Sequence, residues 1–160
     1  MANKKEQMQR FARYMREKEG RDLTSQEIAL PAKLAGWKLP KPKDPLDILA
    51  KEFAEAERDE IKYDEETGDP YRANICYKLT QGDVPRWGDI DKASRDKMIR
   101  NVALRREQMI GDGLQLTRDA NHWNRINPKE EPVQVELDFT DEVQWKLNAP
   151  KEGETGEEAA

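Results

Sequence analysis

The chain lacks the sequence features of exported proteins, membrane proteins and motif-bearing enzymes. No apolar run approaches the roughly 18 residues that a membrane span requires, and the start, MANKKEQMQR, has no apolar stretch of a secretory signal. The single cysteine, Cys76, excludes an internal disulfide, and one cysteine with one histidine is too few for an ordinary zinc site. No glycine-rich phosphate loop, nucleophile elbow or HExxH pair occurs. We therefore expect a cytoplasmic, non-enzymatic protein without a metal or cofactor.

Apolar residues are also scarce, at 36% against 38% charged, so 160 residues should form one modest core. The net charge of −5 is unevenly distributed. Bases outnumber acids 11 to 6 in residues 1–45, whereas acids outnumber bases 17 to 14 in residues 46–128 and 10 to 3 in residues 129–160. The basic start suits nucleic acid, and the acidic end would be repelled by it. A last helical turn is expected around Asp141 to Leu147, and residues 150–160 are expected to be a disordered tail.

Apolar spacing predicts helices over residues 3–19, from Thr24, and from Pro45 to about Glu60. The Thr24 start has the form of a capping box, and Pro31 should kink this second helix or make it restart. A proline-rich connector precedes the third helix. The inward face of the third helix is expected to hold Leu46, Leu49, Ala50, Phe53 and Ala54.

The periodicity then changes from helical to alternating, which predicts a β-hairpin with a turn at residues 65–70 and a return on one face from Tyr71 to Leu79. Residues 82–88 are expected to form a loop. A long helix should begin near Asp89 or Asp91, and its apolar seam is suited to packing against another helix, in the same molecule or in a homodimer.

This order of elements, with the opening Thr24-Ser25-Gln26-Glu27-Ile28-Ala29, resembles the winged helix-turn-helix family over about residues 3–80. The longer proline-rich connector departs from the family pattern. The resemblance implies a mainly α fold with a β-hairpin: a winged-helix-like domain over residues 1–84, a long helix over residues 85–128 packing on the body or a dimer mate, and an extended segment with an acidic tail over residues 129–160.

In the winged-helix family the third helix usually reads bases in the major groove. Here residues 44–60 carry seven acids against two bases, and since phosphate neutralisation supplies much of the affinity for DNA, this helix is a poor reader. Its acids are expected to pair with the basic first half of the long helix, within the protein or across a dimer; the alternative for that basic stretch is phosphate binding. Double-stranded DNA, if bound, should meet these residues through its backbone: Arg10, Arg13, Arg16, Lys38, Lys41, Lys43, Arg72 and Lys78.

Residues Gln134-Val135-Glu136-Leu137-Asp138-Phe139 match the pattern Q-x-x-[L/M]-x-F, which resembles the peptide that docks bacterial replication and repair proteins onto the sliding clamp. The resemblance implies that Gln134 hydrogen-bonds at a pocket edge while Leu137 and Phe139 bury in an apolar cleft. The alternation from Val133 to Phe139 equally predicts an edge strand added to the hairpin.

Together these patterns predict a non-catalytic accessory protein of DNA metabolism, of phage type, whose C-terminal peptide binds a protein partner such as the clamp. The alternative is a dimeric DNA-binding transcriptional regulator that pairs through the long helix. No membrane contact is expected.

Overall fold

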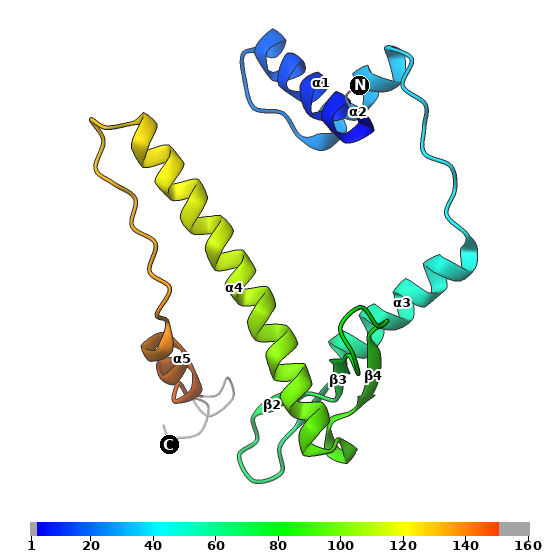
Figure 1. Cartoon of the computed structure of the whole chain (residues 1–160), viewed down its shortest axis with the longest axis vertical. Coiled ribbons are helices and arrows are strands. Elements are labelled where there is room, and N and C mark those ends of the chain that lie inside the picture. Colours follow the sequence, from blue (N-terminus) through cyan, green and yellow to red (C-terminus); the bar gives the residue numbers. More distant parts are fainter. Residues whose placement is uncertain (1–2, 151–160) are drawn as a thin grey trace, which may run out of the picture. The chain divides into compact units, whose positions relative to one another are not determined.

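A computed structural model describes residues 3–150, and it divides into two compact units, one ending at Glu52 and the other beginning at Phe53. The protein is mainly helical, with two small antiparallel strand pairs and one long helix, as the sequence predicts (Figure 1). The expected disorder of residues 150–160 concerns a stretch that lies outside the described residues, except for Pro150.

The first unit contains helices α1 (Lys4–Glu19) and α2 (Ser25–Leu34), which pack on each other. Both begin with a capping box, formed by Asn3 with Glu6 and by Thr24 with Glu27, so the free backbone NH groups of each first turn are satisfied. Gly20 ends α1 with a φ of 65°, a left-handed conformation that glycine adopts without steric cost.

Pro31 lies inside α2, which is one continuous helix. The prediction that the helix must restart at this proline is therefore wrong. Helix α3 (Pro45–Asp59) begins and ends close to the predicted residues, because Asp44 accepts a hydrogen bond from the NH of Leu46 and so caps its start. Its predicted inward face is not buried, since Phe53 is 62% exposed and Leu46 and Leu49 are also exposed. The apolar residues do recur at helical spacing, but within residues 3–150 no other element buries this face.

The strands form two separate pairs, whereas the sequence predicts one hairpin. Strand β1 (Ile61–Tyr63) pairs with β2 (Pro70–Arg72) across the predicted turn. Strand β3 (Asn74–Tyr77) pairs instead with β4 (Arg86–Asp89), so the predicted loop over residues 82–88 is wrong in its second half. The chain turns from one pair to the other at Ala73, whose NH donates to the carbonyl of Glu60 and whose carbonyl accepts from Ile90.

The small core of the second unit lies between β3 and the start of helix α4 (Arg95–Ile126). Ala73, Ile75 and Tyr77 are buried, as the alternation predicts, whereas Leu79 is exposed. Asn101 of α4 is only 6% exposed, and its side-chain NH donates to the carbonyl of Cys76 at 2.7 Å, which satisfies both buried polar groups.

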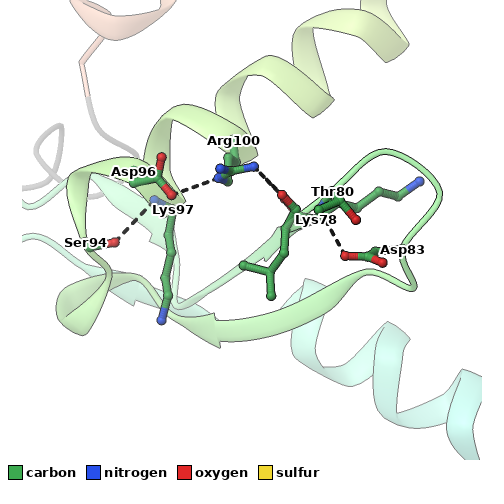
Figure 2. Close-up of polar contacts among 8 residues, drawn as sticks. Lys78, Thr80, Asp83, Ser94, Asp96, Lys97 and Arg100 are labelled. Atoms are coloured by element: carbon green, nitrogen blue, oxygen red, sulfur yellow. Dashed lines mark hydrogen bonds and ion pairs between the residues drawn. The ribbon is translucent and has the colours of Figure 1, made fainter.

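Helix α4 begins later than predicted, at Arg95, after a 3-10 turn η1 (Ile90–Lys92) and a cap at Ser94. Figure 2 shows how Arg100 fastens it to the end of β3: its guanidinium donates to the carbonyl of Leu79 at 2.6 Å and to Asp96 at 2.8 Å. The hydrogen bonds of Arg100 therefore hold the first turns of α4 to the sheet, in addition to the apolar packing.

The last helix, α5 (Thr140–Leu147), confirms the predicted final helical turn. Few side chains are buried among the residues that the structure describes: Met15 in the first unit, and Ala73, Ile75, Tyr77 and Asn101 in the second. Most of the predicted α4 seam, including Ile99, Val102 and Ile110, is exposed. Such a thin core leaves large apolar side chains on the surface of both units.

Candidate functional site

The predicted partner-binding segment runs in an extended conformation beside α4 and returns antiparallel to it (Figure 1). Helix α4 ends at Ile126, and a turn at residues 128–130 reverses the chain. Asn124 then holds the backbone of Val133 from both sides: its side-chain NH donates to the Val133 carbonyl at 3.0 Å, and its side-chain oxygen accepts the Val133 NH at 2.9 Å. This amide clasp fixes the start of the segment.

The second anchor of the segment is Leu137, which lies against Gly113 of α4. A Cβ added to Gly113 would lie 3.4 Å from a methyl carbon of Leu137, an ordinary van der Waals distance, so the leucine side chain lies directly against this position of the helix. On the same helical face, Thr117, Ala120 and Asn124 are half-buried, four, seven and eleven residues after Gly113. The segment therefore lies on a row of small and polar side chains.

The predicted edge strand over Val133–Phe139 is wrong, because no residue of this stretch belongs to either sheet. The alternation is real, but Asn124 takes the backbone groups of Val133 that a strand neighbour would take. Leu137 remains 50% exposed and Phe139 44% exposed, and Gln134 is exposed. The three residues of the Q-x-x-L-x-F pattern are thus accessible on one short segment.

The segment ends at α5, where Asp138 organises the junction. Its carboxylate accepts hydrogen bonds from the NH and the hydroxyl of Thr140, at 3.2 and 2.8 Å, and these bonds lower the pKa of Asp138. Phe139 occupies the position before α5 but makes no side-chain cap. The Asp138 contacts tie the end of the peptide pattern to the helix that follows it.

The predicted DNA-backbone residues are divided between the two units. Arg10, Arg13 and Arg16 lie exposed on α1, and Lys38, Lys41 and Lys43 lie exposed in the connector before α3. Arg72 on β2 is exposed, whereas Lys78 is half-buried just beyond β3. In the first unit, the basic residues of α1 and the connector lie on the surface. In the second unit, Arg72 lies near other arginines that the DNA-backbone prediction did not include.

Within residues 3–150, no ion pair joins the acids of α3 to the first half of α4, so the predicted charge pairing within the protein is not seen there. Arg100 pairs with Asp96 of its own helix, and Lys97 lies 5.4 Å from the ring centre of Tyr77 in a cation–π contact. The remaining cations of that stretch form no ion pair within residues 3–150: Lys92, Arg95, Arg105 and Arg106. Arg100 and Lys97 therefore have partners close to them, on α4 and on β3.

Arg72 and Arg105 line one cleft in the second unit, together with Arg58. We call it the arginine cleft; its volume is about 730 Å³. Arg58 comes from the end of α3, Arg72 from β2 and Arg105 from α4. The other polar and aromatic groups of its lining include Trp87, Asn74, Asn101, Gln108 and Asp112. Sequence reasoning missed this grouping because its residues are far apart along the chain.

Cys76 also lines the arginine cleft. Burial raises the pKa of its thiol, and the nearby positive charges of Lys78 and Arg58 oppose this only in part. A thiol whose pKa is raised is largely protonated at neutral pH and is a weak nucleophile. The cleft therefore offers hydrogen-bond donors and positive charge, not an activated cysteine.

No set of three or more His, Cys, Asp or Glu side chains suitable for a metal ion occurs in the part of the chain that the structure describes. Helices long and apolar enough to cross a membrane are likewise not found over residues 3–150. Comparisons with protein-family models, curated proteins and solved structures found no match to this chain.

Proposed function

We propose that this chain is a non-catalytic accessory protein of DNA metabolism, of phage type, whose C-terminal segment binds a protein partner, the bacterial sliding clamp being the partner its pattern fits. The observation that carries the proposal is the accessibility of Gln134, Leu137 and Phe139 on an extended segment outside both sheets. An extended peptide with a few anchoring side chains is a common mode of partner recognition.

The energetics of the segment support its release to a partner. It is held by the two hydrogen bonds of the Asn124 clasp and by the Leu137 contact with Gly113. Fully burying a Leu or Phe side chain contributes roughly 1.5–3 kcal/mol, so taking Leu137 and Phe139 from half exposure into a pocket would contribute about 1.5–3 kcal/mol together. This gain is comparable to what two partly exposed hydrogen bonds contribute, at roughly 0.5–1.5 kcal/mol each.

The winged-helix-like body belongs to the same proposal and is supported by the order of the elements and by a helix cap. The order of α1, α2, α3 and the β1–β2 pair follows the family order, and the capping box of α2 forms at Thr24. The second strand pair, β3 with β4, is an addition to that order. DNA contact through this body is part of the proposal and depends on the exposed bases of α1 and the connector.

The test measures binding of the whole protein to purified bacterial sliding clamp by isothermal titration calorimetry. The variant Leu137→Ala with Phe139→Ala should lose binding. Val143→Ala with Leu147→Ala is the matched control, because these two side chains are similarly exposed on the adjacent helix α5, and it should bind as the unmodified protein does. Absence of binding by the unmodified protein, or equal binding by the motif variant, would refute the clamp assignment.

A second arm distinguishes the dimeric DNA-binding regulator. The exposed apolar residues of α4, among them Ile99, Val102 and Ile110, favour that candidate because a second helix could cover them. Salt-dependent duplex binding that survives deletion of residues 129–160, by a protein that is dimeric in sedimentation, would support the regulator in place of the accessory protein.

A further inference from the structure

The arginine cleft has more positive charge than the surrounding protein neutralises. The side chains of Arg58, Arg72 and Arg105 make no hydrogen bond or ion pair with any group in the described part of the chain. Asp112 is the acid of the lining, against three arginines. In a protein with 33 acidic residues and 28 basic ones, three guanidinium groups without acid partners around one cleft are an unusual concentration of unused positive charge.

The three arginines approach the cleft from three different elements, which makes the arrangement a product of the tertiary structure. Arg58 is held near β3 because the side chain of Asn74 donates to the carbonyl of Glu57 at 3.0 Å and to Glu60 at 2.8 Å. Arg105 is placed by the packing of α4 on β3, which Asn101 fixes through the Cys76 carbonyl. The scaffold therefore positions the backbone from which each of these two arginines projects.

The chemistry of the lining favours a phosphate group. A guanidinium presents its NH donors in a planar fork that matches phosphate oxygens, and such charge-assisted bonds are stronger than neutral ones. Gln108 supplies a further neutral donor, and Trp87 supplies an aromatic surface. A cleft of about 730 Å³ falls in the range of small-molecule sites and has room for more than a phosphate ion.

We propose that the arginine cleft binds a phosphate ester of nucleotide size, either a free nucleotide or a nucleotide unit of a nucleic-acid strand. Arg58, Arg72 and Arg105 bind the phosphate oxygens, and Asp112 accepts a hydrogen bond from a hydroxyl or amino group of the ligand. This site is separate from the C-terminal segment, and its test does not depend on the clamp.

The experiment titrates the whole protein with inorganic pyrophosphate, with ADP, and with a single-stranded DNA of about ten nucleotides, a length typical of single-strand binding sites. Binding is followed by NMR of the tryptophan indole NH groups, with the Trp87 signal identified from Trp87→Phe. Saturation should shift the Trp87 signal and leave those of Trp37, Trp123 and Trp145 unchanged. Affinity should fall as salt is added, because salt screens charge attraction.

Arg105→Gln and Arg72→Gln should each weaken binding by about tenfold or more, the effect of losing one charge-assisted hydrogen bond. Arg106→Gln is the matched control, because Arg106 is the neighbouring exposed arginine of α4, has no ion pair and does not line the cleft. It should bind almost as tightly as the unmodified protein. Circular dichroism of each variant checks that α4 remains folded.

The three probes identify the source of the phosphate. Tighter binding of ADP than of pyrophosphate indicates a free nucleotide, and saturable binding of the strand alone indicates a nucleic acid. Equal binding of ADP and pyrophosphate would overturn the assignment of a nucleotide-sized ligand, because the cleft would then recognise phosphate groups alone. The proposal is overturned if no probe binds saturably, if Arg106→Gln weakens binding as much as Arg105→Gln, or if binding leaves the Trp87 signal unmoved.

Discussion

The clasp by Asn124 makes the clearest quantitative prediction. Replacing Asn124 with alanine removes both hydrogen bonds to Val133, at 3.0 and 2.9 Å. Each contributes roughly 0.5–1.5 kcal/mol net, and since Asn124 is only half-buried, we expect the lower part of the range, about 1–2 kcal/mol for the pair. At 1.4 kcal/mol per tenfold, the equilibrium for detachment of the segment should shift by about 5- to 30-fold toward the open form.

Amide hydrogen exchange at Val133 measures this shift directly. In Asn124→Ala the Val133 amide should exchange about 5- to 30-fold faster, because exchange requires the Val133 NH to leave its acceptor. Asn121→Ala is the matched control: Asn121 is an exposed asparagine of the same helix without a contact to the segment, and it should leave the Val133 rate unchanged.

Unchanged exchange at Val133 in Asn124→Ala would refute the reasoning, since the amide would then be protected by something other than the clasp. Sliding-clamp affinity gives an independent reading of the same equilibrium. If the peptide binds only when detached, a shift toward the open form raises apparent affinity up to the point at which the open form predominates. Faster exchange with lower affinity would mean that the attached conformation is the one that binds.

Three further predictions concern stability and pH. Asn101→Leu should destabilise the protein by about 1–3 kcal/mol in urea unfolding, because it leaves a buried β3 carbonyl without its donor. Gly111→Ala should stabilise by about 0.5–1 kcal/mol in urea unfolding, since nothing lies within 4 Å of the added Cβ, and Gly113→Ala should do the same because its Cβ would meet Leu137 at an ordinary contact distance of 3.4 Å. The ion pair and hydrogen bond with Arg21 and the hydrogen bonds at Thr24 lower the pKa of Glu27 from 4.5 to about 2; a depressed pKa stabilises the fold fully above the ordinary value, and this contribution is lost as pH falls through about 2. In Arg21→Gln, NMR titration should show a higher pKa for Glu27 than in the unmodified protein, although still below 4.5, because the hydrogen bonds at Thr24 remain.

Local signals in the sequence predicted the helices well, because their ends are set by neighbouring residues. The capping box at Thr24 and the Asp44–Pro45 start both form where the sequence places them, and α5 appears over nearly the predicted residues. The start of α4 was misplaced because Asp89 and Asp91 resemble caps, whereas Asp89 caps only a 3-10 turn and Ser94 begins the helix.

Pairing between distant strands was the part that local patterns could not supply. Arg86–Asp89 follow Pro85 and include Gly88, a composition typical of a loop, and become β4 only through pairing with β3. Conversely, Val133–Phe139 alternate like a strand but pair with neither sheet, and Asn124 binds the backbone of Val133 instead. Both errors arise because a strand is defined by its partner and not by its own side chains.

The candidate sites were predictable to different degrees for the same reason. Gln134, Leu137 and Phe139 lie within six consecutive residues, so a short pattern finds them. Arg58, Arg72 and Arg105 come from three elements and carry no common spacing. The signal that was available, an excess of basic residues early in α4, pointed to the right helix but did not identify which of its cations would stay without an acidic partner.

Both candidate sites use α4, on consecutive stretches of the helix. The arginine cleft is lined from Met98 to Asp112, and the segment lies from Gly113 to Asn124. The first stretch is fixed to β3 by the packing of α4 and by the Asn101 hydrogen bond, whereas the second contacts the segment, so a variant that detaches the segment should not displace Arg105. A substitution at one site that abolished binding at both would mean either that α4 has unfolded or that the two sites are one. Far-ultraviolet circular dichroism of that variant decides between the two, because loss of helix weakens the signal.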